Sequence, residues 1–295
     1  MKKTTAPILL LLLALLTGCA QQQPYAPVAA TTLPVYEFTA ALCEDTSVTV
    51  TRLITEEVSC LHDYSLNVRQ VKAAEAAELI VISGAGLEEF MEDILLDKPS
   101  VDASAGIPLL TPEAHSHDHD AHEEQEGHHH DQDPHIWLSP ENAMIMAQNI
   151  CRGLSDAYPG EAPVFQKNLQ ALLSRLEQLD AYGRETLAEL SCRDLITFHD
   201  GFSYLAHSYG LHILEAVEEE SGSEASAREL IHLIEEVEHH SLPAIFTERS
   251  GAESAASIIS RETGTKQYVL DMAMAGDSYF DAMYHNIDTL KEALQ

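Results

Sequence analysis

Histidine and acidic residues are concentrated in one stretch of the sequence, EAHSHDHDAHEEQEGHHHDQDPHIWL at residues 113–138. Neutral imidazole is the commonest biological metal ligand, and a dense mixture of His with Asp and Glu is typical of metal binding. The sequence therefore predicts that this stretch contacts a divalent metal ion. The plain alternative is a solvated insert that binds no metal.

This stretch divides into a loop and a fixed segment. Residues 113–132 show no helical or strand periodicity and almost no apolar residues, which predicts a loop. His135 instead lies between two prolines and beside Ile136 and Trp137. We expect His135 to be a fixed metal ligand, because apolar neighbours can hold its imidazole in one orientation. The loop histidines are expected to be mobile auxiliary ligands: His115, His117, His119, His122, His128, His129 and His130.

Alternating strands and helices predict an α/β protein of two lobes with parallel-type sheets flanked by helices. In the N-terminal lobe, residues 32–138, strands are expected over 47–54 and 79–86, helices over 34–44, 68–78 and 87–98, and an extended segment over 100–110. In the C-terminal lobe, residues 191–295, strands are expected over 194–200, 211–217, 242–248 and 265–271, and helices over 201–210, 225–240, 254–264 and 277–294.

The segment between the lobes, residues 139–190, is predicted to be helical and to link them. Helical patterns over 141–157 and 162–190 are separated by Tyr158-Pro159-Gly160, and leucines repeat along one face of the second. At 1.5 Å per residue the second stretch could reach about 43 Å. A helix of that length crosses a domain, so we interpret it as a backbone that joins the two lobes.

Three further candidate ligands lie after expected strands. His199 ends one strand and Asp271 ends another, while His62 follows the loop after the strand at 47–54. Ligands of open α/β sheets bind outside the carboxyl ends of the strands. We therefore expect His62, His135, His199 and Asp271 to converge in the cleft between the lobes. Taken alone, each of them can equally be a helix cap or a packing residue.

The expected ligand set favours holding a metal ion over using it in catalysis. Three imidazoles and one carboxylate suit Zn²⁺, whereas a set richer in oxygen suits Mn²⁺. Four protein ligands leave no open position for an activated water. A zinc hydrolase would need such a position and a general base such as Glu248, and the chain lacks HExxH, GxSxG and P-loop motifs. We therefore expect no enzyme activity.

The N-terminus predicts export and lipid anchoring. Residues 1–18 combine Lys2 and Lys3 with an apolar run too short for a bilayer span of roughly 20 residues, which is typical of a signal peptide. The ending LLTGC resembles the bacterial lipobox, in which Cys19 becomes the lipidated first residue. Residues 19–31 are then a polar tether. The expected location is the extracytoplasmic face of the bacterial cell membrane, by a lipid anchor.

The net charge limits which binding partners are expected, and the positions of the cysteines suggest one disulfide. The net charge of −32 excludes nucleic acid as an expected partner and favours cations. Cys43 and Cys60 flank one strand, and a bridge between them would fix the loop that carries His62, so this is the preferred disulfide. In the alternative interpretation Cys60 is a thiolate ligand.

Several segments together resemble the solute-binding lipoproteins of bacterial zinc and manganese ABC importers, over essentially the full mature length. The matching segments are LHDYSLNVRQ, ISGAGLEEFMEDIL, DPHIWLSPENA after the His-rich loop, TFHDGFSYLA and VLDMAMAGDSYFDAMYHNIDTL, with the lipobox residue Cys19. The resemblance implies two α/β lobes bridged by one long helix, with the metal buried between them.

Position by position, the resemblance implies that His62, His135 and His199 are the first three ligands. Asp271 matches the aspartate that some members use as the fourth, with Glu57, Cys60 or water as alternatives. Members selective for manganese generally have Glu where His199 stands, so zinc is expected and manganese is the alternative.

The function implied is high-affinity zinc capture by a monomer and delivery to a membrane permease, without an adhesion role. A zinc buffer or chaperone that uses the His-rich loop is the other function considered.

Overall fold

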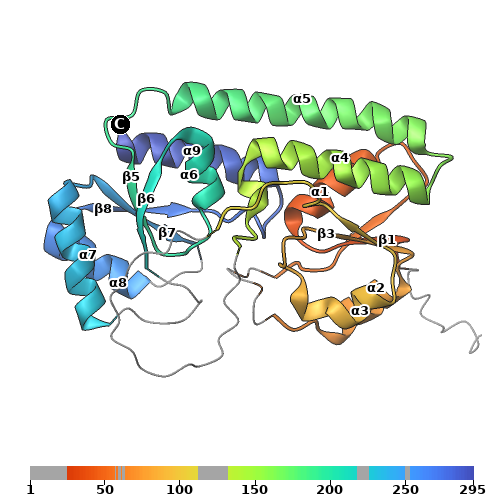
Figure 1. Cartoon of the computed structure of the whole chain (residues 1–295), viewed down its shortest axis with the longest axis horizontal. Coiled ribbons are helices and arrows are strands. Elements are labelled where there is room, and N and C mark those ends of the chain that lie inside the picture. Colours follow the sequence, from red (N-terminus) through yellow and green to blue (C-terminus); the bar gives the residue numbers. More distant parts are fainter. Residues whose placement is uncertain are drawn as a thin grey trace, which may run out of the picture.

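The computed structural model describes residues 25–295 except residues 57, 59–60, 62–63, 112–131, 218–225 and 250–252. Two lobes lie side by side beneath a pair of long helices (Figure 1). Each lobe contains a four-stranded sheet in which every pairing is parallel. The predicted α/β fold with two parallel sheets is confirmed.

The N-terminal sheet has the strand order β2-β1-β3-β4. Its strands are β1 (Val28–Ala30), β2 (Val50–Arg52), β3 (Leu79–Ile82) and β4 (Ser100–Asp102). Strand β1 is fully buried and pairs with both β2 and β3, so the assignment of residues 28–30 to a tether was wrong. A three-residue apolar run is too short to show the alternation that identifies a strand.

Helices cover both faces of this sheet. Helix α1 (Leu33–Leu42) packs between the sheet and the long helices, and α2 (Val68–Ala76) and α3 (Glu92–Leu96) lie on the other side (Figure 1). Asn67 begins α2 with a capping box, in which its side chain accepts from Gln70 N–H and Gln70 Oε1 accepts in return. The predicted helix over 87–98 is a 3₁₀ turn, η2 (Glu89–Met91), followed by α3 alone.

Two helices form the predicted linking segment: α4 (Pro140–Ala157) and α5 (Ala162–Thr186). Ser139 caps α4 through its hydroxyl, and the 25-residue α5 ends earlier than the predicted residue 190. Helix α5 packs on α1 of the first lobe and on α9 (Tyr279–Leu294) of the second, and it runs across both (Figure 1). Its buried face holds Leu169, Leu172, Leu176 and Leu179.

The C-terminal sheet repeats the topology of the first, with the order β6-β5-β7-β8. Its strands are β5 (Asp194–Thr197), β6 (His212–Ala216), β7 (Ala244–Glu248) and β8 (Lys266–Leu270). The helices between and after them are α6 (Ser203–Tyr209), α7 (Ala227–His240), α8 (Glu253–Thr263) and α9. Each predicted strand and helix of this lobe is present.

The carboxyl edges of the two sheets face each other. Arg52, at the end of β2, donates from its guanidinium to the carbonyls of Met274 and Gly276, in the loop after β8. Leu33 N–H, just after β1, also donates to Met274 O. Residues that follow strands of both lobes are therefore brought together, as the sequence predicted. Among the described residues, no helix has the length and apolar character needed to cross a membrane.

Cys43 lies at the end of α1 as a free, buried cysteine. The predicted bridge to Cys60 stays a prediction, because Cys60 lies outside the described residues. The Cys43 side chain belongs to the apolar core, and burial raises the pKa of its thiol to about 12. Within the described residues, the side chain therefore packs as a small hydrophobic residue.

Candidate metal-binding site

His135 is held rigidly between Asp133 and a short 3₁₀ turn, η3 (Ile136–Leu138). Asp133 Oδ1 accepts a hydrogen bond from the His135 backbone N–H and lies 2.8 Å from the imidazole Nδ1. A carboxylate only accepts, so Nδ1 carries the proton and Nε2 has a lone pair. His135 is 2% exposed, and Nε2 has no hydrogen-bond partner among the described residues. A carboxylate that fixes one ring nitrogen in this way orients the other nitrogen of a histidine toward a metal ion.

His199 follows β5 and is brought against His135. The two imidazole centroids are 5.3 Å apart with the ring planes 82° to each other, and His199 is 4% exposed. Gly201 provides the space for this ring, because a Cβ at that position would lie 2.6 Å from His199 Cδ2 and 2.6 Å from Met272 Cε. His199 and Met272, the residue after Asp271, therefore share one packing site.

Asp271 follows β8 with its backbone clamped by α9. Asn286 accepts from Asp271 N–H and donates to its carbonyl, both at 2.7 Å. The Asp271 carboxylate accepts from Ala273 N–H at 2.8 Å, and its Oδ2 lies 3.0 Å from Arg249 Nη2. The Asp271 carboxylate is thus paired with a cation, which was not predicted from the sequence.

Trp137 connects the His135 segment to the Asp271 segment. Its indole Nε1–H donates to Met272 O at 2.7 Å, and its carbonyl accepts from the Tyr279 hydroxyl at 2.8 Å. The Trp137 side chain is fully buried. The His135 segment and the C-terminal lobe therefore form one framework around the two histidines.

On the facing edge of the N-terminal lobe, Glu88 ties two strand ends together. Its carboxylate accepts from the Thr31 hydroxyl after β1 and from the backbone N–H groups of Ser83 and Gly84 after β3. Burial raises the pKa of Glu88 to about 7, although these three donors oppose the shift. Glu88 was not singled out from the sequence, where it stands in an ordinary acidic helical pattern.

The remaining candidates have different positions. Glu248 ends β7, is 5% exposed and pairs in register with Leu270. His62, Glu57, Cys60, Cys19 and the loop histidines lie outside the described residues. Of the predicted ligand set, the structure therefore brings together His135 and His199, while Asp271 directly precedes Met272, which packs near His199.

Sequence reasoning missed the residues that orient these ligands: Asp133, Gly201, Arg249 and Asn286. Two of them left a local signal, since Asp133 precedes His135 by two residues and Gly201 follows His199 by two. Arg249 and Asn286 reach the site from other elements, so only the folded chain shows their role. The assembled groups are nitrogen donors with a nearby carboxylate, a donor set that suits Zn²⁺.

Comparisons with known proteins identify the family of the chain. The family model "Zinc-uptake complex component A periplasmic" matches residues 28–293. The chain is 31% identical over 307 residues to the zinc-binding lipoprotein AdcA of Streptococcus pneumoniae, covering 99% of this chain and 61% of that protein. It therefore spans less than two thirds of the length of this relative.

Two solved structures have the same fold. The Zn(II)-bound ZnuA-like domain of S. pneumoniae AdcA superposes with a TM-score of 0.75 at 27% identity, covering 91% of this chain and 98% of that one. The solute-binding protein FpvC of Pseudomonas aeruginosa, solved in complex with Mn²⁺, gives a TM-score of 0.77 at 25% identity, covering 92% and 98%.

Two parallel α/β lobes under a shared helix, with His135 and His199 packed together, match the fold of solved metal-binding solute-binding proteins. Within that class, the chain belongs to the family of the zinc-uptake complex component A. The resemblance noted from the sequence motifs is confirmed.

Proposed function

We propose that the chain captures zinc on the extracytoplasmic side of a bacterial membrane and delivers it to the permease of an ABC importer. The observation that carries this proposal is His135, whose Nδ1 is fixed by Asp133 while its Nε2 is buried next to His199. Family membership supports zinc as the cargo.

The proposed ligands are His62, His135, His199 and Asp271. His135 and His199 supply imidazole nitrogens from fixed positions. Asp271 supplies a carboxylate oxygen after zinc displaces Arg249 from its ion pair with Asp271. We propose that the His-rich loop collects zinc weakly at several sites, raises its local concentration and passes it to the cleft. Capture and release involve no covalent chemistry.

The same proposal includes how the protein is anchored to the membrane and which partner it meets there. Lipidation of Cys19 would hold the protein at the membrane beside its permease, and a single chain would present the loaded lobes. The AdcA relative is itself described as a lipoprotein, which supports this location.

The test is a competitive zinc and manganese titration of the mature chain from Ala20, intact and with residues 115–131 deleted. The chain must begin before Val28, because truncation at residue 32 would remove the buried strand β1. We expect one tight zinc-selective site that survives the deletion. Loss of tight binding with the loop would favour the buffer or chaperone function, and preference for manganese would favour a manganese importer.

A pair of variants controls this titration. His199→Ala should weaken the tight site, because it removes a buried imidazole next to His135. His207→Ala, an exposed histidine on α6 of the same lobe, should leave it unchanged. Equal effects of the two variants would show that the tight site is not in the cleft.

A further inference from the structure

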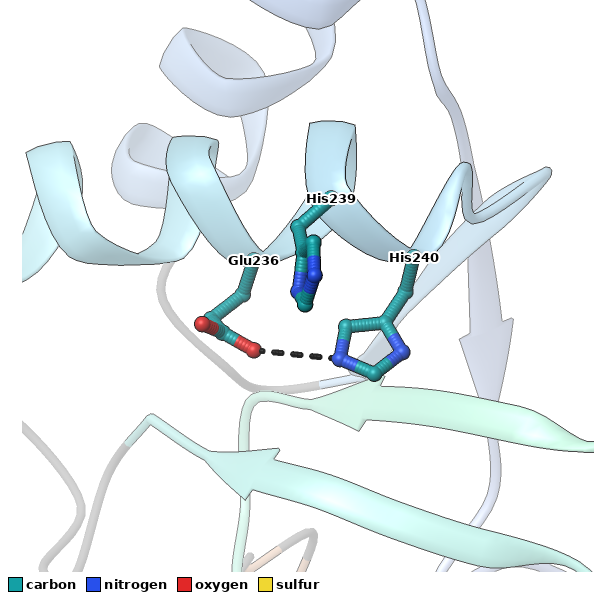
Figure 2. Close-up of side chains that lie close together, drawn as sticks. All are labelled: Glu236, His239 and His240. Atoms are coloured by element: carbon teal, nitrogen blue, oxygen red, sulfur yellow. Dashed lines mark ion pairs between the residues drawn. The ribbon is translucent and has the colours of Figure 1, made fainter.

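A second group of metal-ligating side chains lies at the end of α7, far along the chain from the cleft residues. Glu236, His239 and His240 occupy positions i, i+3 and i+4, which place them on one face of the helix. One potential ligand atom from each residue lies within 4.8 Å of the others. Figure 2 shows the three side chains converging from the last turn of α7.

The contacts within the group extend beyond one ion pair. His240 Nε2 lies 3.4 Å from Glu236 Oε2, the contact drawn as a dashed line in Figure 2. The His239 and His240 ring centroids are 4.8 Å apart. An ion pair explains the approach of Glu236 and His240, but it does not explain why His239 turns to the same point.

The helix end that carries the group is rigid. Val237 is 2% exposed and anchors this turn in the apolar cluster beneath the sheet. Ser241 ends the helix in the left-handed region, and Leu242 N–H donates to Val237 O at 3.0 Å. The side chains therefore project from a fixed base. The carboxyl end of a helix also carries negative partial charge, which favours a cation.

A carboxylate on the neighbouring strand stands behind His240. Asp194 Oδ2, at the start of β5, lies 3.8 Å from His240 Nδ1, and Asp194 Oδ1 lies 3.3 Å from His212 Nδ1 at the start of β6. His240 thus has a carboxylate at each ring nitrogen. The negative charge of these two carboxylates favours a cation beside the imidazole of His240.

We propose that Glu236, His239 and His240 form a second site for a divalent transition metal, with zinc the best match. Two nitrogens and one oxygen leave a coordination position of a tetrahedral ion open to water. Because β5 begins at Asp194 and His199 follows its other end, the site lies at the opposite edge of the sheet from the cleft. It needs neither the cleft ligands nor the proposed delivery function.

The test is histidine footprinting of the full mature chain with diethyl pyrocarbonate, which labels unligated imidazole, across a zinc titration. Mass spectrometry resolves the labels on His232, His239 and His240 in α7. We expect labelling of His239 and His240 to be lost as zinc rises beyond the first equivalent. His232, which pairs with Glu215 of β6, should keep its labelling. Unchanged labelling of His239 and His240 in excess zinc would overturn the proposal.

Matched variants separate ligation from other effects. Glu236→Gln should raise the zinc concentration for half protection by at least about 10-fold, the lower end of the effect of losing a metal-linked partner. Glu235→Gln removes the same charge from the adjacent exposed position and should leave protection unchanged. His135→Ala should not affect it either. If His135→Ala abolished protection on α7, that protection would be a consequence of cleft loading, and the second site would be rejected.

Discussion

The site at His135 and His199, in the predicted cleft, and the end of α7 both place a carboxylate near an imidazole, but in opposite surroundings. In the cleft, Asp133 lies 2.8 Å from His135 Nδ1, with side chains 5% and 3% exposed. On α7, Asp194 lies 3.8 Å from His240 Nδ1, with side chains 36% and 31% exposed. The buried contact is a hydrogen bond, whereas the exposed contact is too long for one and is electrostatic only. The difference is that the buried pair is ordered before metal arrives, whereas the exposed pair must be ordered by it.

The two sites also depend differently on the fold. His135, His199 and Asp271 come from segments far apart in sequence, so the cleft exists only when both sheets and the linking helices are assembled. Glu236, His239 and His240 come from one turn of one helix. Zinc in the cleft should therefore stabilise the whole fold, because a ligand that binds only the native state shifts unfolding. Zinc on α7 should bind more weakly and exchange faster.

The largest expected difference between the sites is seen on removing one histidine from each. His135→Ala should weaken the tightest zinc site by more than about 100-fold, since losing an orienting partner alone costs 10- to 100-fold. His240→Ala should leave that site unchanged and abolish protection of His239. Competitive titration measures the first effect and footprinting the second. If His240→Ala weakened the tightest zinc site as much as His135→Ala does, the assignment of that site to the cleft would be wrong.

The next contrast concerns the carboxylates behind the histidines. Asp133→Asn keeps a hydrogen-bond acceptor for His135 but removes a buried charge at 2.8 Å, and we expect it to weaken the cleft by about 10-fold. Asp194→Asn acts over 3.8 Å at a partly exposed position and should weaken the α7 site by less than about fivefold. Equal losses would show that burial does not set the difference between the sites.

Trp137→Phe tests whether the hydrogen-bonded framework around the cleft contributes to stability and to zinc affinity. The substitution removes the indole N–H and leaves Met272 O, its acceptor at 2.7 Å, without that partner in a buried region. The free energy of unfolding should fall by about 2 kcal/mol, with a modest loss of cleft affinity. Chemical denaturation measures the first quantity. Protection of His239 should not change, and a loss there would mean that the α7 site also depends on the framework.

Much of this architecture could be predicted from periodicity and strand-end position. The strand ends that carry His199 and Asp271 follow from the βα alternation, because parallel strands place their carboxyl ends at one edge. Strand β1 could not be identified, since Val28–Ala30 is too short for a pattern. The helix predicted over 87–98 is shortened to α3 after a turn in which Gly84 and Gly86 adopt positive φ.

Contacts between distant elements were beyond sequence reasoning. Arg249 meets Asp271 across 22 positions, and Asn286 clamps the same residue from α9. The α7 group is the opposite case, because the spacing of Glu236, His239 and His240 was present in the sequence. It resembled an ordinary exposed helix face, and only the measured convergence of the side chains distinguishes it.

The smallest expected effect concerns Arg249, a cation beside the cleft. Its ion pair with Asp271 spans 3.0 Å between side chains 58% and 16% exposed. Such an exposed pair contributes about 0.5 kcal/mol. If Asp271 is the fourth ligand, zinc must displace Arg249, so Arg249→Gln should tighten cleft binding by about two- to threefold. Arg261→Gln, which removes an equally charged, exposed residue of α8, should not change it.

A double-mutant cycle separates displacement of Arg249 from a general charge effect, because coupling appears only between groups that interact. In the Asp271→Asn background, Arg249→Gln should no longer tighten zinc binding, since there is no carboxylate left for zinc and Arg249 to compete for. If the gain persisted there, Arg249 would act through its charge alone, and Asp271 would lose its proposed role. If Arg249→Gln instead weakened binding, the guanidinium would be orienting the Asp271 carboxylate as Asp133 orients His135, and the cleft would contain two oriented ligands.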